Sequence, residues 1–441
     1  MTTTSISENR GSELTPPPAG KLGPKVKQLG PGLLAAATGV GAGDLVATMI
    51  AGARFGTVLL WAAVLGTILK LALGEGVGRW HLASGTTLLD GWRRLGRWAT
   101  TFFGGYIIIW GFVYGATAMS AVGLPLNALF GGLPVRYWAM IAGVVGLALV
   151  WAQRYHVFEK FMTVLVLLKF VSVVSIAVLV MPSLGDITSG LVPRLPDGST
   201  VYVLGLVGGV GGTITMAAYG YWMFAKGWRG TGWLSMMRLD NAVGYVMTGI
   251  FVVAMLIVGS AMLLGQDLTA SDSGLLVLGT ALGEQYGEWA RILFLAGFLA
   301  VTSSSLLGVW NGVSLLFADW TRTVRLPHGR HAESAAEAAE RTEKEVVEVA
   351  VEKSRWFRGY LLWLTFPPMV LLFLDKPFGL TLVYGVLGSV FMPFLAITLM
   401  LLLNSKRIAK EGRSGWVSNG LLGAASALFL ALLVTDLVTR F

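Results

Sequence analysis

The sequence lacks cysteine, contains only four histidines and has few charged residues for its length. Charged side chains make up 13% of the 441 residues, whereas soluble domains average about a quarter. Without cysteine there are no disulfides, thiolate metal sites or cysteine nucleophiles, and four histidines are too few for a histidine-rich cluster. HExxH, GxSxG and P-loop motifs are absent as well. These absences exclude an ordinary cytosolic enzyme, and we expect a protein that is not an enzyme.

Long apolar segments fill most of the chain. Hydrophobic residues make up 55% of it, and the mean hydropathy is +0.70. A membrane-spanning helix needs about 20 apolar residues, and several of the segments are free of charge over that length. We therefore predict an all-α integral membrane protein with about eleven transmembrane helices. The predicted spans are roughly 31–53, 56–76, 99–125, 135–152, 157–181, 200–224, 241–265, 291–318, 359–374, 379–403 and 415–438.

Lysine and arginine are concentrated in every second loop. The formal net charge of +9 arises between apolar runs, which fits positive-inside loops and gives no basic patch for nucleic acid. We expect a multi-pass protein of the cell membrane that contacts the lipid bilayer and binds no nucleic acid. The N-terminus is then cytoplasmic and Phe441 lies outside. Residues 266–290 form an acidic outer loop that could attract cations, although a solvated loop is the simpler interpretation.

The expected organisation is a single transmembrane domain, residues 28–439, with two soluble parts. The polar residues 1–27 are expected to form a loose cytoplasmic tail. Residues 326–357 alternate alanine and valine with glutamate, which predicts a cytoplasmic helical loop with a packing role.

Two glycine clusters interrupt spans at corresponding places. The first span contains the run 39–44 and the sixth contains 208–213, with four uninterrupted spans between them. Glycine also serves close helix packing, but two clusters in register favour broken helices in an inverted repeat of five plus five spans. The repeats would cover about 28–182 and 199–404, with an extra helix at 415–438. Broken helices at corresponding positions mark a binding site near the midplane.

Asp44 lies inside the first glycine cluster. A carboxylate within an apolar span is costly and indicates function, and its hard oxygen suits a metal cation. An ion pair with Lys70 or Lys169 is the structural alternative. Lys70 and Glu75, five residues apart on the second span, are expected to snorkel or to pair. Lys169 interrupts the fifth span and would be a tethered cation beside a polar cavity.

A series of short motifs runs along most of the chain. They are Gly30-Pro31-Gly32, Ala51-Gly52-Ala53, Leu59-Leu60-Trp61, Ser84-Gly85, Leu126-Asn127-Ala128-Leu129-Phe130-Gly131, Glu159-Lys160, Thr302-Ser303-Ser304-Ser305 and Met392-Pro393-Phe394. Their order and spacing resemble the Nramp family of divalent-metal transporters over about 28–439. The resemblance implies a LeuT-like fold and inward transport of a divalent metal cation by alternating access, with the metal as substrate and no cofactor.

The chain departs from the family at its signature positions. Where the family has Asp-Pro-Gly-Asn, the first span reads Gly41-Ala42-Gly43-Asp44. Where the family has Met-Pro-His, the sixth span reads Met216-Ala217-Ala218, and a register shift of one residue would take Met216 out of the site. The family's acidic residues of the third span are replaced by Gly115 and Ala118. The resemblance therefore implies an enlarged site with few direct ligands.

These departures favour a partly hydrated ion. Magnesium dehydrates reluctantly and binds through one or two carboxylates, so we expect transport of magnesium and/or manganese with weak or absent proton coupling, similar to Nramp-related magnesium transporters. Two alternatives stay open: proton-coupled uptake of manganese or iron, and an amino-acid or organic-solute transporter on the same fold. We expect a monomer. The expected ion-binding residues are Asp44, Gly41, Thr38, Thr213, Thr215 and Met216, with Ser303, Ser304 and Ser305 as surrounding hydroxyls.

Overall fold

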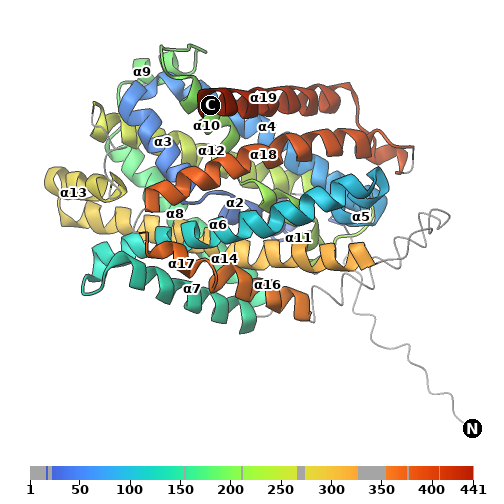
Figure 1. The fold of residues 1–441 in the computed structure, drawn as a ribbon. Helices are drawn as coiled ribbons and strands as arrows, with labels where there is room; N and C mark the ends of the chain where they lie inside the picture. The colour runs from blue at the N-terminus through green and yellow to red at the C-terminus, as the bar shows by residue number, and fades with distance from the viewer. Residues whose placement is uncertain are drawn as a thin grey trace, which may run out of the picture.

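The computed structural model describes residues 16–17, 22–152, 155–209, 212–265, 274–325, 354–374, 377–406 and 408–440. The described residues contain helices and connecting turns and no β-strand. Figure 1 shows the long helices α6, α14, α18 and α19 lying nearly parallel to one another. Their bounds are Arg97–Phe130, Glu288–Arg325, Pro377–Leu403 and Trp416–Arg440.

Helices occupy all eleven predicted spans. The remaining spans correspond to α2 (Pro31–Gly39) with α3 (Ala42–Phe55), α4 (Leu60–Ser84), α7 (Val135–Ala152), α8 (Tyr155–Leu179), α10 (Thr200–Gly209) with α11 (Tyr219–Ala225), α12 (Leu234–Leu263), and α16 (Arg355–Thr365) with α17 (Met369–Leu372). Six helical stretches in the described part of the chain are long and apolar enough to cross a membrane. Two shorter apolar stretches, Val390–Leu403 and Trp416–Ala431, lie in α18 and α19.

The remaining short helices precede the first span, connect the spans or, like η2, fall within one. They are α1 (Leu22–Val26), α5 (Leu88–Leu95), α9 (Leu184–Gly190), α13 (Gly274–Tyr286), and the 3₁₀ helices η1 (Gly56–Leu59), η2 (Ile214–Ala218), η3 (Thr231–Trp233) and η6 (Lys410–Gly412). Helix α1 falls inside the predicted loose tail, and Lys25 next to its end donates a hydrogen bond to Ser235 Oγ of α12. Of the predicted cytoplasmic loop 326–357, residues 326–353 lie outside the described part, and residues 355–357 begin α16.

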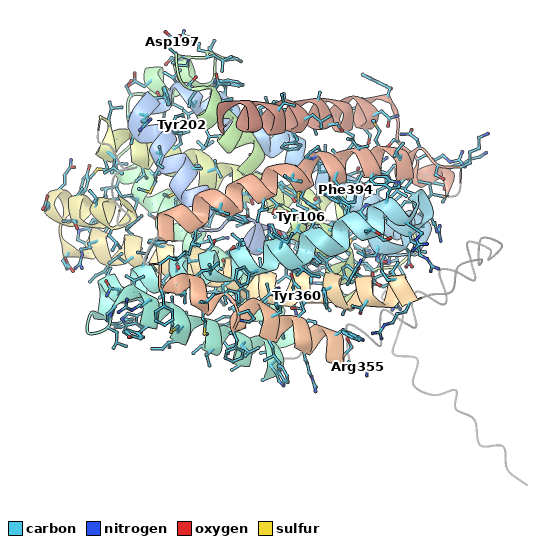
Figure 2. The ribbon with its side chains drawn as sticks, in the orientation of Figure 1. Tyr106, Asp197, Tyr202, Arg355, Tyr360 and Phe394 are labelled. Carbon is cyan, nitrogen blue, oxygen red and sulfur yellow. The ribbon has the colours of Figure 1, made fainter. Side chains whose placement is uncertain are left out.

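Two long helices, α12 and α14, each pack against a group of neighbours. In one group α12 packs on α2, α3 and α4, and in the other α14 packs on α6, α7 and α16. Two tyrosines stabilise the second group and its junction with α18 (Figure 2). Tyr360 of α16 donates to the Ile107 carbonyl of α6 at 2.6 Å, and Tyr106 of α6 donates to the Leu387 carbonyl of α18 at 3.0 Å. Buried hydroxyls thus find backbone acceptors within the apolar interior, as burial requires.

The start of α2 is fixed against α12 by a buried carboxylate. Asp240 of α12 accepts hydrogen bonds from the backbone N–H groups of Gly30 at 2.9 Å and Gly32 at 2.5 Å. These N–H groups lack helical partners at a helix N-terminus, where negative charge is favourable. Tyr219 of α11 donates to the same carboxylate at 2.9 Å. One aspartate therefore joins the ends of both broken spans to α12.

Candidate functional site

The first predicted break lies between α2 and α3. Helix α2 ends at Gly39, Val40 is extended at φ −102° and ψ 109°, and α3 begins at Ala42 after Gly41. A break of this kind leaves the last carbonyls of α2 without helical partners. The structure confirms that the glycine cluster interrupts the first span.

Side chains from α8 and α14 satisfy the free carbonyls at the end of α2. Ser304 Oγ donates to the Ala37 carbonyl at 3.0 Å, and Ser305 Oγ donates to the Thr38 carbonyl at 3.1 Å. Lys169 Nζ donates to the carbonyls of Ala36 at 3.0 Å and Ala37 at 3.1 Å. Two of the predicted surrounding serines therefore stabilise the break itself.

Asp44 stands in the first turn of α3, facing the break. Its Oδ2 accepts the Gly41 N–H at 2.8 Å, which caps α3 and places the negative charge at a helix N-terminus. The residue is only 6% exposed, and its Oδ1 has no hydrogen-bond partner among the described residues. A buried charged oxygen without a partner is costly, so Asp44 offers an unfilled acceptor at this point.

The second break lies between α10 and η2 and meets the first. Helix α10 ends at Gly209 and η2 begins at Ile214, while residues 210–211 lie outside the described part. Gly212 has φ +85°, a left-handed conformation that favours glycine. It also lies so close to the first break that a Cβ at 212 would come within 2.9 Å of Gly39 Cα. The two glycine clusters thus let the broken backbones touch.

Lys70 of α4 lies at the second break. It is fully buried, and its Nζ donates to the Gly212 carbonyl and lies 3.7 Å from Met392 Sδ. The expectation that Lys70 snorkels or pairs with Glu75 is wrong, because Glu75 pairs instead with Arg79 at 3.0 Å and Arg238 at 3.1 Å. Each break is therefore held by one buried lysine.

The structural alternative for Asp44 was a direct ion pair with one of these lysines. Among the described residues no ion pair within 4 Å includes Asp44. Both ammonium groups attract the Asp44 carboxylate from a greater distance. Each ammonium donates to backbone carbonyls, so the unpartnered Asp44 oxygen stays available.

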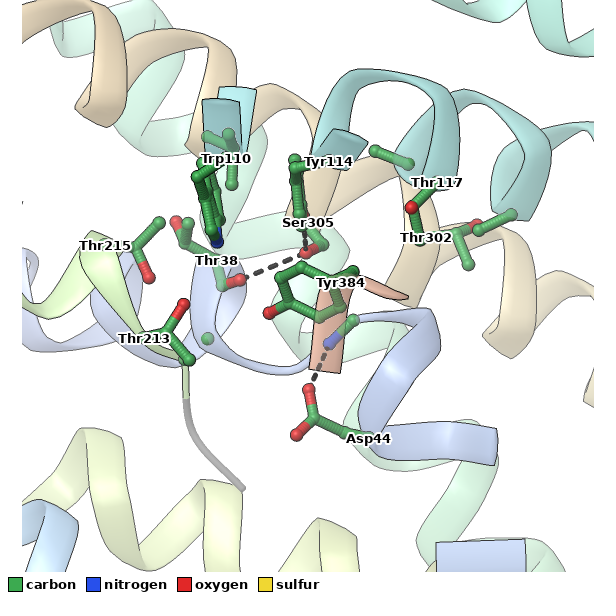
Figure 3. A pocket seen from close by; sticks show the side chains of 16 residues that line it. Thr38, Asp44, Trp110, Tyr114, Thr117, Thr213, Thr215, Thr302, Ser305 and Tyr384 are labelled. Atoms are coloured by element: carbon green, nitrogen blue, oxygen red, sulfur yellow. Dashed lines mark hydrogen bonds between the residues drawn. The ribbon is translucent and has the colours of Figure 1, made fainter. Parts of the chain in front are cut away.

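A cavity lies between the two breaks (Figure 3). The breaks supply its floor, α6 and α14 supply a wall, and Tyr384 of α18 closes another side. Among the described residues, the groups that line it and can bind an ion are one carboxylate, several hydroxyls and backbone groups, with no imidazole or thioether. The lining residues are Thr38, Gly39, Gly41, Asp44, Trp110, Tyr114, Thr117, Ala118, Ala121, Gly212, Thr213, Thr215, Thr302, Ser305, Val309 and Tyr384.

The structure brings five of the six expected ion-binding residues to this cavity. Thr38, Gly41, Asp44, Thr213 and Thr215 all line it. Met216 does not line it, although it is buried in η2 at 2% exposure. A 3₁₀ turn has about three residues, so neighbouring side chains of η2 point in quite different directions.

An aromatic wall is the part of the site that sequence reasoning missed. Trp110 and Tyr114 of α6 stack with ring centroids 4.5 Å apart, and Tyr384 lies 5.0 Å from Tyr114. The Tyr114 hydroxyl shares a 2.7 Å hydrogen bond with Ser305 Oγ. The only available signal was the i, i+4 spacing of Trp110 and Tyr114, which places them on one face of a helix.

Comparisons with known proteins agree with this architecture. The profile of the family described as "Natural resistance-associated macrophage protein-like" (Nramp) matches residues 32–439. The "Divalent metal cation transporter MntH" of Mycobacterium tuberculosis is 26% identical over 302 residues, covering 65% of this chain and 69% of that protein. The protein of the same name from Mycobacterium leprae is 25% identical over 308 residues, covering 65% and 70%.

Solved structures show the same fold. The manganese transporter of Eremococcus coleocola, in complex with an aromatic bis-isothiourea substituted compound, superposes with a TM-score of 0.72 at 15% identity, over 99% of this chain and 91% of that one. The inward-facing conformation of Mhp1 gives 0.51 at 16% identity, over 93% and 89%. The helical spans, the paired breaks and the profile match together show that this chain is a multi-pass membrane protein of the Nramp family with a LeuT-like fold.

Proposed function

We propose that the protein is a transporter that carries divalent metal cations through the cavity beside Asp44 by alternating access. The proposal is supported by the family, by the names of the Mycobacterium relatives, and by the unpartnered Asp44 oxygen where the two breaks meet. Broken helices at such a junction serve as the binding site in transporters of this architecture. The metal is the substrate, and transport requires no cofactor.

The transported ion is magnesium, with manganese alongside it or instead of it. The observation that carries this assignment is the lining of the cavity, which offers one carboxylate with hydroxyl and backbone groups and excludes Met216. Magnesium favours oxygen ligands and keeps much of its water, whereas imidazole and thioether ligands favour softer transition metals. Asp44, Gly41, Thr38, Thr213 and Thr215 are the proposed ion-binding residues.

Transport is weakly coupled to protons or uncoupled from them. Coupling needs a titratable relay within the membrane, and Asp44 is the only carboxylate or imidazole among the described residues that line the cavity. Of the two positions where the family has acidic residues in the third span, Ala118 lines the cavity. At Gly115 a Cβ would lie 2.4 Å from the Leu364 carbonyl, which leaves no room for a carboxylate.

The membrane potential is sufficient to drive inward movement in the proposed orientation. The basic loops favour an N-terminus in the cytoplasm and a C-terminus outside, and we propose this orientation with a monomer as the working unit. Moving one charge inward releases about 2.3 kcal/mol per 100 mV. A divalent ion releases about twice that amount, so uptake needs no second ion gradient.

Metal flux into proteoliposomes with a pH dye inside tests the ion and the coupling together. Magnesium, manganese and calcium are offered separately, and amino acids are added as competitors. We expect influx of magnesium and manganese without acidification and without competition by amino acids. Manganese influx with acidification and no magnesium influx would show a conventional proton-coupled transporter, and inhibition by amino acids would favour an organic substrate.

Two neighbouring substitutions test which residues of η2 contact the ion. Thr215→Val removes a hydroxyl that lines the cavity and should lower magnesium flux by about tenfold, because one ion contact is lost. Met216→Leu conserves volume outside the cavity and should leave the ratio of magnesium to manganese flux unchanged. If Met216→Leu alters that ratio, the thioether contacts the ion in some step of the cycle.

A further inference from the structure

Lys169 occupies the C-terminal end of the first half-helix. Lys169 belongs to the membrane-spanning helix α8 and is only 3% exposed. The ammonium donates to the carbonyls of Ala36 and Ala37 at 3.0 and 3.1 Å and lies 5.9 Å from the ring centroid of Phe251. Every described polar contact of this ammonium is therefore with a carbonyl oxygen or an aromatic face.

These surroundings have the chemistry of a monovalent-cation site. The end of a helix carries partial negative charge on its free carbonyls, and unwound carbonyls with half-helix C-terminal ends are where broken-helix transporters coordinate sodium. Two hydroxyl groups lie at the same helix end. Ser304 donates to the Ala37 carbonyl, which Lys169 also contacts, and Ser305 donates to the neighbouring Thr38 carbonyl. A free cation could recruit both hydroxyl oxygens as further ligands.

We propose that Lys169 is a tethered cation that fills a monovalent-cation site at the end of α2. The protein then needs no sodium or potassium to stabilise the first break, since the Lys169 ammonium supplies the positive charge. This inference rests on the proposed transport function only where it predicts metal flux. The predicted binding of a monovalent cation rests on the geometry alone.

Lys70 lies at the second break and provides a matched comparison with Lys169. It is also buried, but among the described residues its ammonium contacts one carbonyl, that of Gly212, and the Met392 sulfur. One carbonyl and a thioether do not make a sodium site, because hard cations need several oxygen ligands. Removing each ammonium should therefore have different consequences in sodium.

The test measures the unfolding temperature of purified Lys169→Met in sodium chloride, potassium chloride and choline chloride. Removing the ammonium leaves carbonyls without a partner, so Lys169→Met should unfold at a lower temperature than the wild type in choline. Sodium or potassium should raise that temperature in a saturable way. Neither salt should change the unfolding temperature of the wild type, and neither should specifically raise that of Lys70→Met. Metal flux into proteoliposomes should fall about tenfold or more in choline and recover in the same salt.

Several results would overturn the proposal. They are a wild type whose flux requires sodium, a folded Lys169→Met variant that behaves alike in all three salts, and rescue of Lys70→Met by the same salt. Lys169→Ala, purified throughout in sodium chloride, covers the case in which the methionine variant does not fold. Failure of both variants to fold in sodium and in potassium would also contradict the proposal. If the wild type moves no divalent metal, the function proposed above fails, and salt-dependent stabilisation still decides the role of Lys169.

Discussion

Replacing Asp44 by alanine should abolish divalent-metal transport while the protein still folds. Asp44 is the one carboxylate in the cavity lining, and its Oδ1 has no partner among the described residues. Losing a charge-assisted contact to the ion removes about 3 kcal/mol, which corresponds to a fall in flux of about 100-fold. Initial rates of magnesium and manganese uptake into proteoliposomes measure the effect. The fold itself should tolerate the change because the wild-type carboxylate is buried with an unsatisfied oxygen.

One further variant separates the charge of Asp44 from its shape, and a second is a control outside the cavity. Asp44→Asn keeps an oxygen that can accept the Gly41 N–H, so it should fold like the wild type and lose nearly as much flux as Asp44→Ala. Asp186→Asn removes an exposed carboxylate in α9, outside the cavity, and should transport normally. Normal flux in folded Asp44→Ala would refute the assignment of the site.

The positions of the two breaks could be predicted from the sequence because the residues that mark them destabilise a membrane-spanning helix. A run of glycines weakens a helix by up to about 1 kcal/mol at each position, and a carboxylate in an apolar span costs still more. A chain keeps such residues where the fold or the function needs them. The clusters 39–44 and 208–213 therefore predicted both breaks, and Asp44 stands at one of them.

The partners of the breaks were not readable in the same way. Lys169 and Ser304 contact the first break from helices more than 100 residues away, and no local pattern reveals which carbonyl a distant side chain will reach. Met216 shows a second limit. The helical period that assigns faces in an α-helix fails in the 3₁₀ turn of η2, so sequence spacing could not decide that Thr215 faces the cavity and Met216 does not.

Replacing Gly32 by alanine should strongly destabilise the protein. Gly32 lies where α2 touches α12, and a Cβ there would come within 2.1 Å of the Asp240 backbone oxygen. The contact is tight from both sides, since a Cβ at Gly244 would come within 2.4 Å of the Gly32 oxygen. Backbone atoms cannot swing aside as a side chain can, so the two helices must separate. Overpacking of this kind costs about 3 kcal/mol. The midpoint of thermal unfolding in detergent measures the loss.

The same separation would disturb function before the protein unfolds. The Gly32 N–H donates to Asp240 at 2.5 Å, and Tyr219 of α11 shares that carboxylate, so moving α2 away from α12 loosens both broken spans at once. Gly105→Ala is the matched control, because Gly105 lies on the exposed face of α6 with no atom within 4 Å of its added Cβ. Alanine there should be neutral or slightly stabilising, since it removes the entropic penalty of a helical glycine. Equal unfolding midpoints for the Gly32 and Gly105 variants would mean that close packing at Gly32 does not hold α2 against α12. The first half-helix would then be free to move relative to α12.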